Sequence, residues 1–205
     1  MSDRVSSAGK AVIFDLGNVV LDWNVDTILM SLDFETELRE RIRAELFDHQ
    51  RWIDLDHGKT SEDDVIAEIC ARTGVAAEFI EAALQAAKHS LLPIEETLLL
   101  MQELVERGID MLCLSNMSRE TWAHVQQYEF MDWFRGIVIS GIEVRMKPNP
   151  DVFLLLLERF ELDAQNCLFI DDSLANIETA RNLGIDAYHF QRSPACYSEL
   201  RSRLL

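Results

Sequence analysis

The chain contains no apolar run long enough to cross a membrane, and its opening MSDRVSSAGK lacks the apolar segment of a secretory signal. We therefore expect a cytoplasmic protein with no membrane partner. The 4 cysteines are widely spaced and form no C-x-x-C pair, so we expect reduced thiols in the core. Internal repeats, low-complexity tracts and long linkers are also lacking, which excludes a repeat array.

Positive charge is scarce in this chain. Lysine and arginine total 19 against 36 aspartates and glutamates, which gives a formal net charge of −17 at pH 7. Such a surface does not attract phosphate backbones, so we expect no nucleic-acid partner. A hydrophobic share of 48% is enough for a buried core and excludes intrinsic disorder. The length of 205 residues suits one domain that carries an inserted module, as a monomer or homodimer.

Short apolar stretches of strand length recur along the chain. We expect strands at 11–14, 111–114, 137–139, 167–170 and 187–190. Most of these stretches do not alternate with polar residues, which is typical of parallel strands covered on both faces. The segments between the later strands have helical periodicity, and we expect helices at 93–108, 119–128, 151–159 and 174–183. This alternation predicts an α/β fold with a doubly wound parallel, Rossmann-like sheet.

Residues 22–92 differ, because they have helical periodicity but no convincing strand. Ser61 is a helix cap for a helix that ends at Gly74, and a second helix is expected at 76–89. One apolar stripe is formed by Ile28, Leu29, Leu32, Leu38, Ile42 and Leu46. We therefore predict an α/β core from residues 1–21 plus 93–205, with an inserted α-helical module at 22–92.

Polar side chains follow three of the expected strands. Asp15 follows the first strand, Ser115 and Asn116 the second, and Asp171 and Asp172 the fourth. Each of these residues alone is best explained as the start of a loop or a helix cap. The carboxyl ends of parallel strands, however, share one edge of the sheet, where ligands bind. All three sets together therefore favour a common site.

These residue types suit phosphoryl transfer. The three aspartates offer the oxygen ligands that Mg²⁺ prefers, with waters and a substrate phosphate completing its coordination. A carboxylate beside the metal is also an available nucleophile, and Asp15 would attack phosphorus to form an aspartyl phosphate. Ser115, with backbone amides around Asn116, would hold the phosphoryl oxygens. Lys147 in MKPNP would supply the positive charge needed by the nucleophile and the transferring group.

The chain resembles the haloacid dehalogenase-like hydrolase superfamily over nearly all of its length. Its four motifs occur in order as VIFDLGNV, LCLSN, the lysine of RMKPNPDVF, and LFIDDSLAN. The resemblance implies that Asp15 is the nucleophile and that Ser115 and Lys147 hold the phosphate. It also implies that Asp172 binds the metal with the assistance of Asp171, and that Asn176 supports the loop. The resemblance also implies that the insert is a helical cap that closes over the site and selects the substrate.

One position departs from the family pattern. The usual phosphatase of this family has a second aspartate two residues after the nucleophile, as general acid and base, where this chain has Gly17. The Gly17 carbonyl is still available to a metal. The DLGNV motif resembles that of bacterial sugar-1-phosphate phosphatases, notably those acting on α-D-glucose 1-phosphate. The anomeric oxygen of such a substrate is a better leaving group than an ordinary alkoxide, so a weakened acid is more tolerable. Asp22, His57 or water are the alternatives for the missing acid.

Aromatic residues of the insert admit two interpretations. Trp23, Trp52, His49 and His57 would line a sugar-binding pocket and stack on a pyranose, or the tryptophans would fill the core of a helical bundle. The sequence leaves both open, with pocket lining favoured most for Trp52 and His57.

The function predicted from these residues is a Mg²⁺-dependent phosphatase acting on a small phosphorylated metabolite, with a sugar phosphate such as a sugar 1-phosphate favoured. A dehalogenase is an alternative in which Asp15 attacks carbon, but the Asp171 and Asp172 pair argues against it because that displacement needs no Mg²⁺. The other alternative is a non-catalytic phosphometabolite-binding or regulatory protein, in which Gly17 marks lost chemistry.

Overall fold

The computed structural model describes residues 10–205, so most of the amino-terminal segment considered above lies outside the described residues. Its centre is a five-stranded sheet in which every pair of neighbours is parallel, in the order β3-β2-β1-β4-β5. The strands are β1 (Ala11–Phe14), β2 (Met111–Ser115), β3 (Gly136–Ile139), β4 (Cys167–Asp171) and β5 (Asp186–His189). The expected α/β class with a doubly wound parallel sheet is confirmed.

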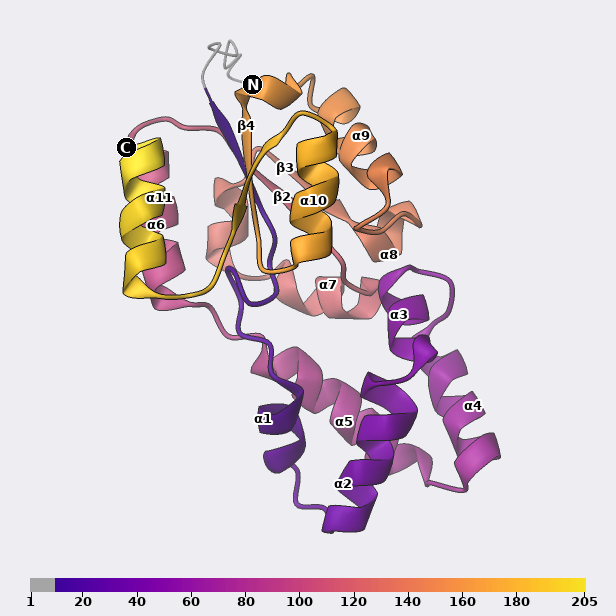
Figure 1. Cartoon of the computed structure of the whole chain (residues 1–205). Coiled ribbons are helices and arrows are strands. Elements are labelled where there is room, and N and C mark those ends of the chain that lie inside the picture. The colour runs from indigo at the N-terminus through magenta and orange to yellow at the C-terminus, as the bar shows by residue number, and fades with distance from the viewer. Residues whose placement is uncertain (1–9) are drawn as a thin grey trace.

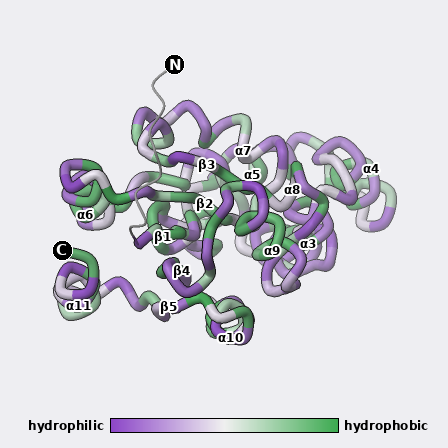
Figure 2. The backbone as a smooth tube through the Cα atoms, turned by 90° about the horizontal axis from the view of Figure 1, so that it is seen from above, coloured by the Kyte–Doolittle hydropathy of each residue, from purple (hydrophilic) through white to green (hydrophobic). Residues whose placement is uncertain are grey.

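Helices cover both faces of the sheet (Figure 1). One face packs on α6 (Glu95–Glu106), α7 (Arg119–Val125) and α11 (Pro194–Leu204), and the other on α9 (Pro150–Arg159) and α10 (Leu174–Asn182). Successive side chains of a strand point to opposite faces, so Val12 and Phe14 join the first layer and Ala11 and Ile13 the second. Figure 2 shows hydrophilic and hydrophobic stretches within single helices, as this sandwich requires.

Some helix limits differ from those expected. Helix α6 begins at Glu95 rather than Pro93, because Pro93 forms a bridge with Leu21. Helix α7 ends at Val125 rather than at residue 128, and is followed by a 3₁₀ turn at Glu129–Trp133. Shorter elements are α8 (Ser140–Glu143) and a second 3₁₀ turn at Ala164–Asn166. Within residues 10–205, the helices are all too short or too polar to cross a membrane.

Five helices and one π-helical turn lie between β1 and α6, at the lower end of Figure 1. They are α1 (Val25–Met30), α2 (Thr36–Ile42), the turn Arg43–Phe47, α3 (Gln50–Asp56), α4 (Glu62–Thr73) and α5 (Ala77–Ser90). The expected apolar stripe is divided, because α1 ends before Leu32. As expected, Ser61 caps α4, and Gly74 ends it with a left-handed φ of 72°.

The helical segment, residues 25–90, buries its own apolar cluster, which includes Ile28, Leu46 and Ile69. It joins the sheet through two adjacent stretches of chain. There the Asp22 N–H donates to the Leu92 carbonyl at 2.8 Å, and the Ile94 N–H donates to the Val20 carbonyl at 2.8 Å. The division into a core and an inserted module at residues 22 and 92 remains a prediction.

Candidate active site

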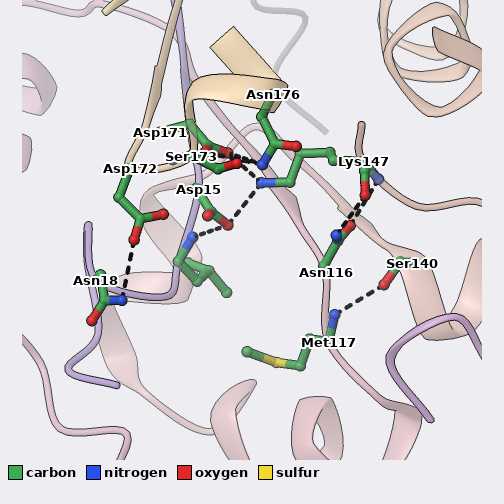
Figure 3. A network of polar contacts seen from close by, with 11 residues as sticks. Asp15, Asn18, Asn116, Met117, Ser140, Lys147, Asp171, Asp172, Ser173 and Asn176 are labelled. Carbon is green, nitrogen blue, oxygen red and sulfur yellow. Dashed lines mark hydrogen bonds and ion pairs between the residues drawn. The ribbon is translucent and has the colours of Figure 1, made fainter. Parts of the chain in front are cut away.

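Three carboxylates meet beyond the carboxyl ends of the two central strands (Figure 3). Asp15 follows β1, Asp171 ends β4 and Asp172 comes next, and one oxygen of each lies within 4.8 Å of the others. The backbone holds Asp15 in place, since its N–H donates to the Ile170 carbonyl at 3.0 Å and its Oδ1 accepts the Leu16 N–H at 2.7 Å. The sheet thus brings together residues far apart in the sequence.

Lys147 is the positive charge in this cluster. Its ammonium Nζ lies 2.9 Å from Asp15 Oδ1 and 2.7 Å from Asp171 Oδ2, and its side chain is only 1% exposed. Burial alone would lower the pKa of Lys147, but the two aspartates outweigh burial and raise that pKa above its usual value. Lys147 is therefore a fixed cation at the edge of the sheet.

Asn116 holds the backbone that carries Lys147. Its Nδ2 donates to the Lys147 carbonyl at 2.8 Å, and its Oδ1 accepts the Lys147 N–H at 2.9 Å. The Asn116 side chain is thereby engaged by the backbone of Lys147, and the phosphate-holding function expected from the sequence rests on backbone amides rather than on this side chain. Ser115 is buried at the end of β2, beside this clamp.

Asp171 and Asp172 have different surroundings. Asp171 is fully buried and accepts bonds from Lys147 Nζ, from the Ser173 N–H at 2.8 Å, and from Asn176 Nδ2 at 3.0 Å to each oxygen. Asn176 thus contacts this loop as the resemblance implies. Asp172 is only partly buried, and burial raises its pKa. The geometry makes Asp171 an anchor for Lys147 and leaves Asp172 the more open carboxylate.

Asn18 is a site residue that the sequence analysis missed. Its Nδ2 donates to Asp172 Oδ2 at 3.1 Å, and its backbone has a left-handed φ of 56°. Asparagine adopts this conformation more readily than most residues, so an asparagine in the turn after the nucleophile is the signal that could have identified it.

The cluster carries more negative than positive charge. Burial raises the pKa of Asp15 to about 7; Lys147 opposes this shift, and Asp171 and Asp172 add to it. Carboxylates held this close repel one another, which a cation between them relieves. Hard oxygen donors of this kind fit a divalent cation such as Mg²⁺.

A cavity of about 110 Å³ lies beside the cluster, between the helical segment and the sheet. Its lining residues are Gly17, Trp23, Trp52, Asp56, Leu91, Asn116, Met117 and Thr121. Both tryptophans that the sequence offered as pocket residues, Trp23 and Trp52, line the cavity. Their rings stack on each other, with centroids 5.2 Å apart. Of the other residues considered, His49 caps α3, His57 follows that helix, and Asp22 pairs with Arg192.

Comparison with known proteins identifies the family. A haloacid dehalogenase-like hydrolase family model matches residues 10–184. The chain belongs to the haloacid dehalogenase-like hydrolases. The chain is thus a HAD-like hydrolase, as expected, and phosphatases recur among its relatives, which supports the expected phosphatase.

Two fungal relatives match most of the hydrolase. The sesquiterpene phosphatase astK of Aspergillus oryzae is 27% identical over 94% of this chain and 95% of its own length. The drimenol cyclase drtB of Aspergillus calidoustus is 22% identical over 93% of this chain, but the match spans only 36% of that longer protein.

The fold is shared with solved structures. A HAD family enzyme from Bacteroides thetaiotaomicron, in complex with magnesium and inorganic phosphate, has a TM-score of 0.71 and 22% identity. The match covers 89% of this hydrolase and 94% of that chain. At this identity the likeness shows a common fold, in which the crevice at the carboxyl ends of the strands is available for ligands.

Proposed function

We propose that the chain is a Mg²⁺-dependent phosphatase that hydrolyses a small phosphorylated metabolite through an aspartyl phosphate on Asp15. The observation that carries this proposal is the position of the Asp15 carboxylate, which contacts the Lys147 ammonium and has one oxygen within 4.8 Å of an oxygen of each of two further carboxylates. From the sequence alone, we further propose a cytoplasmic monomer or homodimer.

Asp15, Asp172 and the Gly17 carbonyl are the groups that we assign to the metal. Asp171, which the sequence places in the same set, has both oxygens bonded to Lys147 and its neighbours, so we assign it mainly to holding that lysine. Bound Mg²⁺ would neutralise the charge that repels an incoming phosphate. A magnesium and phosphate complex of a structurally similar enzyme supports this choice of ion.

The reaction has two halves. An Asp15 oxygen forms a bond to phosphorus, and the bond between phosphorus and the ester oxygen breaks to release the alcohol. A water oxygen then attacks the same phosphorus, which releases inorganic phosphate and regenerates the Asp15 carboxylate. Lys147, Ser115 and backbone amides near Asn116 stabilise the phosphoryl oxygens in both halves.

A sugar 1-phosphate is the favoured substrate. Position 17 has no acidic side chain, and an anomeric oxygen depends less on protonation than an ordinary alkoxide does. Trp23 and Trp52 in the cavity lining offer aromatic surface for a pyranose. The same rings, with Leu91 and Met117, also suit an apolar group, and the similarity to a sesquiterpene phosphatase makes a terpenyl phosphate the second candidate.

The test is a substrate panel with purified protein, with and without Mg²⁺. It contains α-D-glucose 1-phosphate, glucose 6-phosphate, farnesyl phosphate, p-nitrophenyl phosphate and, for the dehalogenase alternative, 2-chloropropionate. We expect Mg²⁺-dependent phosphate release, fastest with glucose 1-phosphate. Binding of phosphate esters without turnover would support the non-catalytic alternative, and chloride release would support the dehalogenase.

A further inference from the structure

Asp56 is an acidic residue of the helical segment that faces the candidate active site. It is the last residue of α3, and it lines the same cavity as Gly17 and Asn116. Gly17 stands where phosphatases of the family usually carry their acid, as the sequence analysis noted. The cavity therefore brings a carboxyl group from another part of the chain toward the position at which that function is missing.

The core holds the carboxyl end of α3 closely. The Ser140 hydroxyl, at the start of α8, donates to the Asp56 carbonyl. The same hydroxyl accepts the Met117 N–H at 2.9 Å (Figure 3). Gly58 has a left-handed φ of 75°, and a Cβ there would lie 2.3 Å from the Gly141 carbonyl oxygen. Only glycine permits this approach, so the contact fixes Asp56 relative to α8, which follows β3.

The environment of Asp56 suits proton transfer. Burial raises its pKa to about 7 and the charge of Asp15 adds to the shift, whereas hydrogen bonding from the Ser118 backbone and the Trp52 side chain opposes it. Among residues 10–205, no lysine, arginine or histidine forms an ion pair with Asp56 within 4.0 Å. A carboxyl group that exchanges its proton near neutral pH is what general acid and base catalysis requires.

We propose that Asp56 is the general acid and base of this enzyme, supplied by the helical segment in place of a side chain at position 17. This inference rests on the proposed phosphatase function. In the first half, the Asp56 carboxyl gives its proton to the ester oxygen as the bond from phosphorus to that oxygen breaks. In the second half, the Asp56 carboxylate takes a proton from the attacking water, which restores the starting state when phosphate leaves Asp15.

Gly17 provides an independent way to test the idea. Its backbone is not left-handed, and a Cβ added there meets no atom within 4 Å, so the backbone accepts a side chain at this position. A carboxylate introduced at position 17 should therefore take over the function that we assign to Asp56. Both changes alter the proton supply and leave the nucleophile intact.

The experiment compares Asp56→Asn with wild type on two Mg²⁺-saturated substrates, p-nitrophenyl phosphate and glucose 6-phosphate. Nitrophenolate leaves without a proton and a primary alkoxide does not, so kcat/KM should fall by about 10²–10⁴-fold for glucose 6-phosphate and only a few-fold for the aryl ester. Asp54→Asn is the matched control, because Asp54 lies on the same helix and pairs with Arg51. It should leave both values unchanged.

The double variant Gly17→Asp with Asp56→Asn should recover at least tenfold of the lost glucose 6-phosphate activity. Asp56→Ser serves as a second variant if the amide does not fold, as judged by circular dichroism. Equal losses on both substrates, or no loss, would overturn the assignment of Asp56 while leaving the phosphatase intact. Failure of wild-type protein to release phosphate from any ester with Mg²⁺ would instead overturn the proposed function, and this inference with it.

Discussion

The two sides of the candidate site are built in different ways. On the sheet side, Asp15, Asp171 and Lys147 form a buried ionic cluster fixed by the strands and by Asn116. On the helical side, Asp56 stands at the end of a helix of 7 residues and is held through Ser140 and the close approach at Gly58. The sheet side thus has the features of a rigid reaction centre. The position of Asp56 on the helical side depends on contacts between the end of α3 and α8.

This difference suggests that the two sides supply different functions in the reaction. In the proposed mechanism, the groups that stay at the phosphorus in both halves of the reaction lie at the sheet, where strand pairing fixes their positions. The proposed general acid, which would meet the variable leaving oxygen, lies on the part of the chain that also lines the cavity. Variants that separate these two contributions break or sharpen the comparison.

The largest effect is expected for Asp15→Asn on the sheet side. The amide keeps the size of the carboxylate but is not a nucleophile, so kcat should fall by roughly 10⁴–10⁶-fold with the fold retained. Rapid-quench kinetics and circular dichroism measure the two quantities. Asp186→Asn is the control, because Asp186 is the first residue of β5 and forms an exposed pair with Lys10. Turnover by Asp15→Asn at the wild-type rate would contradict the covalent mechanism.

Removal of the metal should have the next largest effect. With excess EDTA, kcat should fall at least about 10³-fold, because a bound cation stabilises transition-state charge by several kcal/mol. Mg²⁺ should also raise the melting temperature of wild-type protein, since it binds the folded state. Asp172→Ala should lose both effects, whereas Asp163→Ala, in a distant 3₁₀ turn, should keep them. An unchanged melting temperature of wild type in Mg²⁺ would count against the assigned metal site.

The sheet side was largely predictable from the sequence, and the helical side was not. Asp15 and Asp171 were predicted because they follow apolar strands, and parallel strands bring their carboxyl ends together. Lys147 was predicted as the positive charge in MKPNP that a nucleophile and a phosphoryl group require. No such rule places the end of α3, which depends on packing between segments 84 residues apart, such as Asp56 and Ser140. The aspartate two residues before Gly58 is a signal that the sequence offers, but that spacing does not indicate that Asp56, rather than Asp54 or Asp48, lines the cavity.

The pH profile separates the two sides further. General acid catalysis needs the protonated Asp56 carboxyl, whose fraction falls tenfold per pH unit above its pKa of about 7. For glucose 6-phosphate, kcat/KM should therefore fall above about pH 7 in the wild type. The negative charge of Asp15 contributes to the raised pKa of Asp56. The Arg119 side chain donates a hydrogen bond to the Gly141 carbonyl and forms no ion pair with Asp56 among the described residues. Asp56→Asn should remove the alkaline decline, and a decline that persists unchanged would assign it to another group.

The smallest loss of activity is expected for Gly58→Ala. This variant is also the most direct test of the contact between the two sides. Gly58 and Gly74 both have a left-handed φ, 75° and 72°, so alanine at either position should lower the free energy of unfolding by about 1–2 kcal/mol. At Gly58 the new Cβ also meets the Gly141 carbonyl, whereas at Gly74 it meets no atom within 4 Å. Gly58→Ala should therefore displace Asp56 and lower kcat/KM for glucose 6-phosphate by roughly tenfold, with p-nitrophenyl phosphate less affected. Gly74→Ala should leave both kinetic values unchanged, and urea unfolding measures the stability of each variant. Equal kinetics in the two variants would show that the approach of Gly58 to Gly141 has no part in placing the acid.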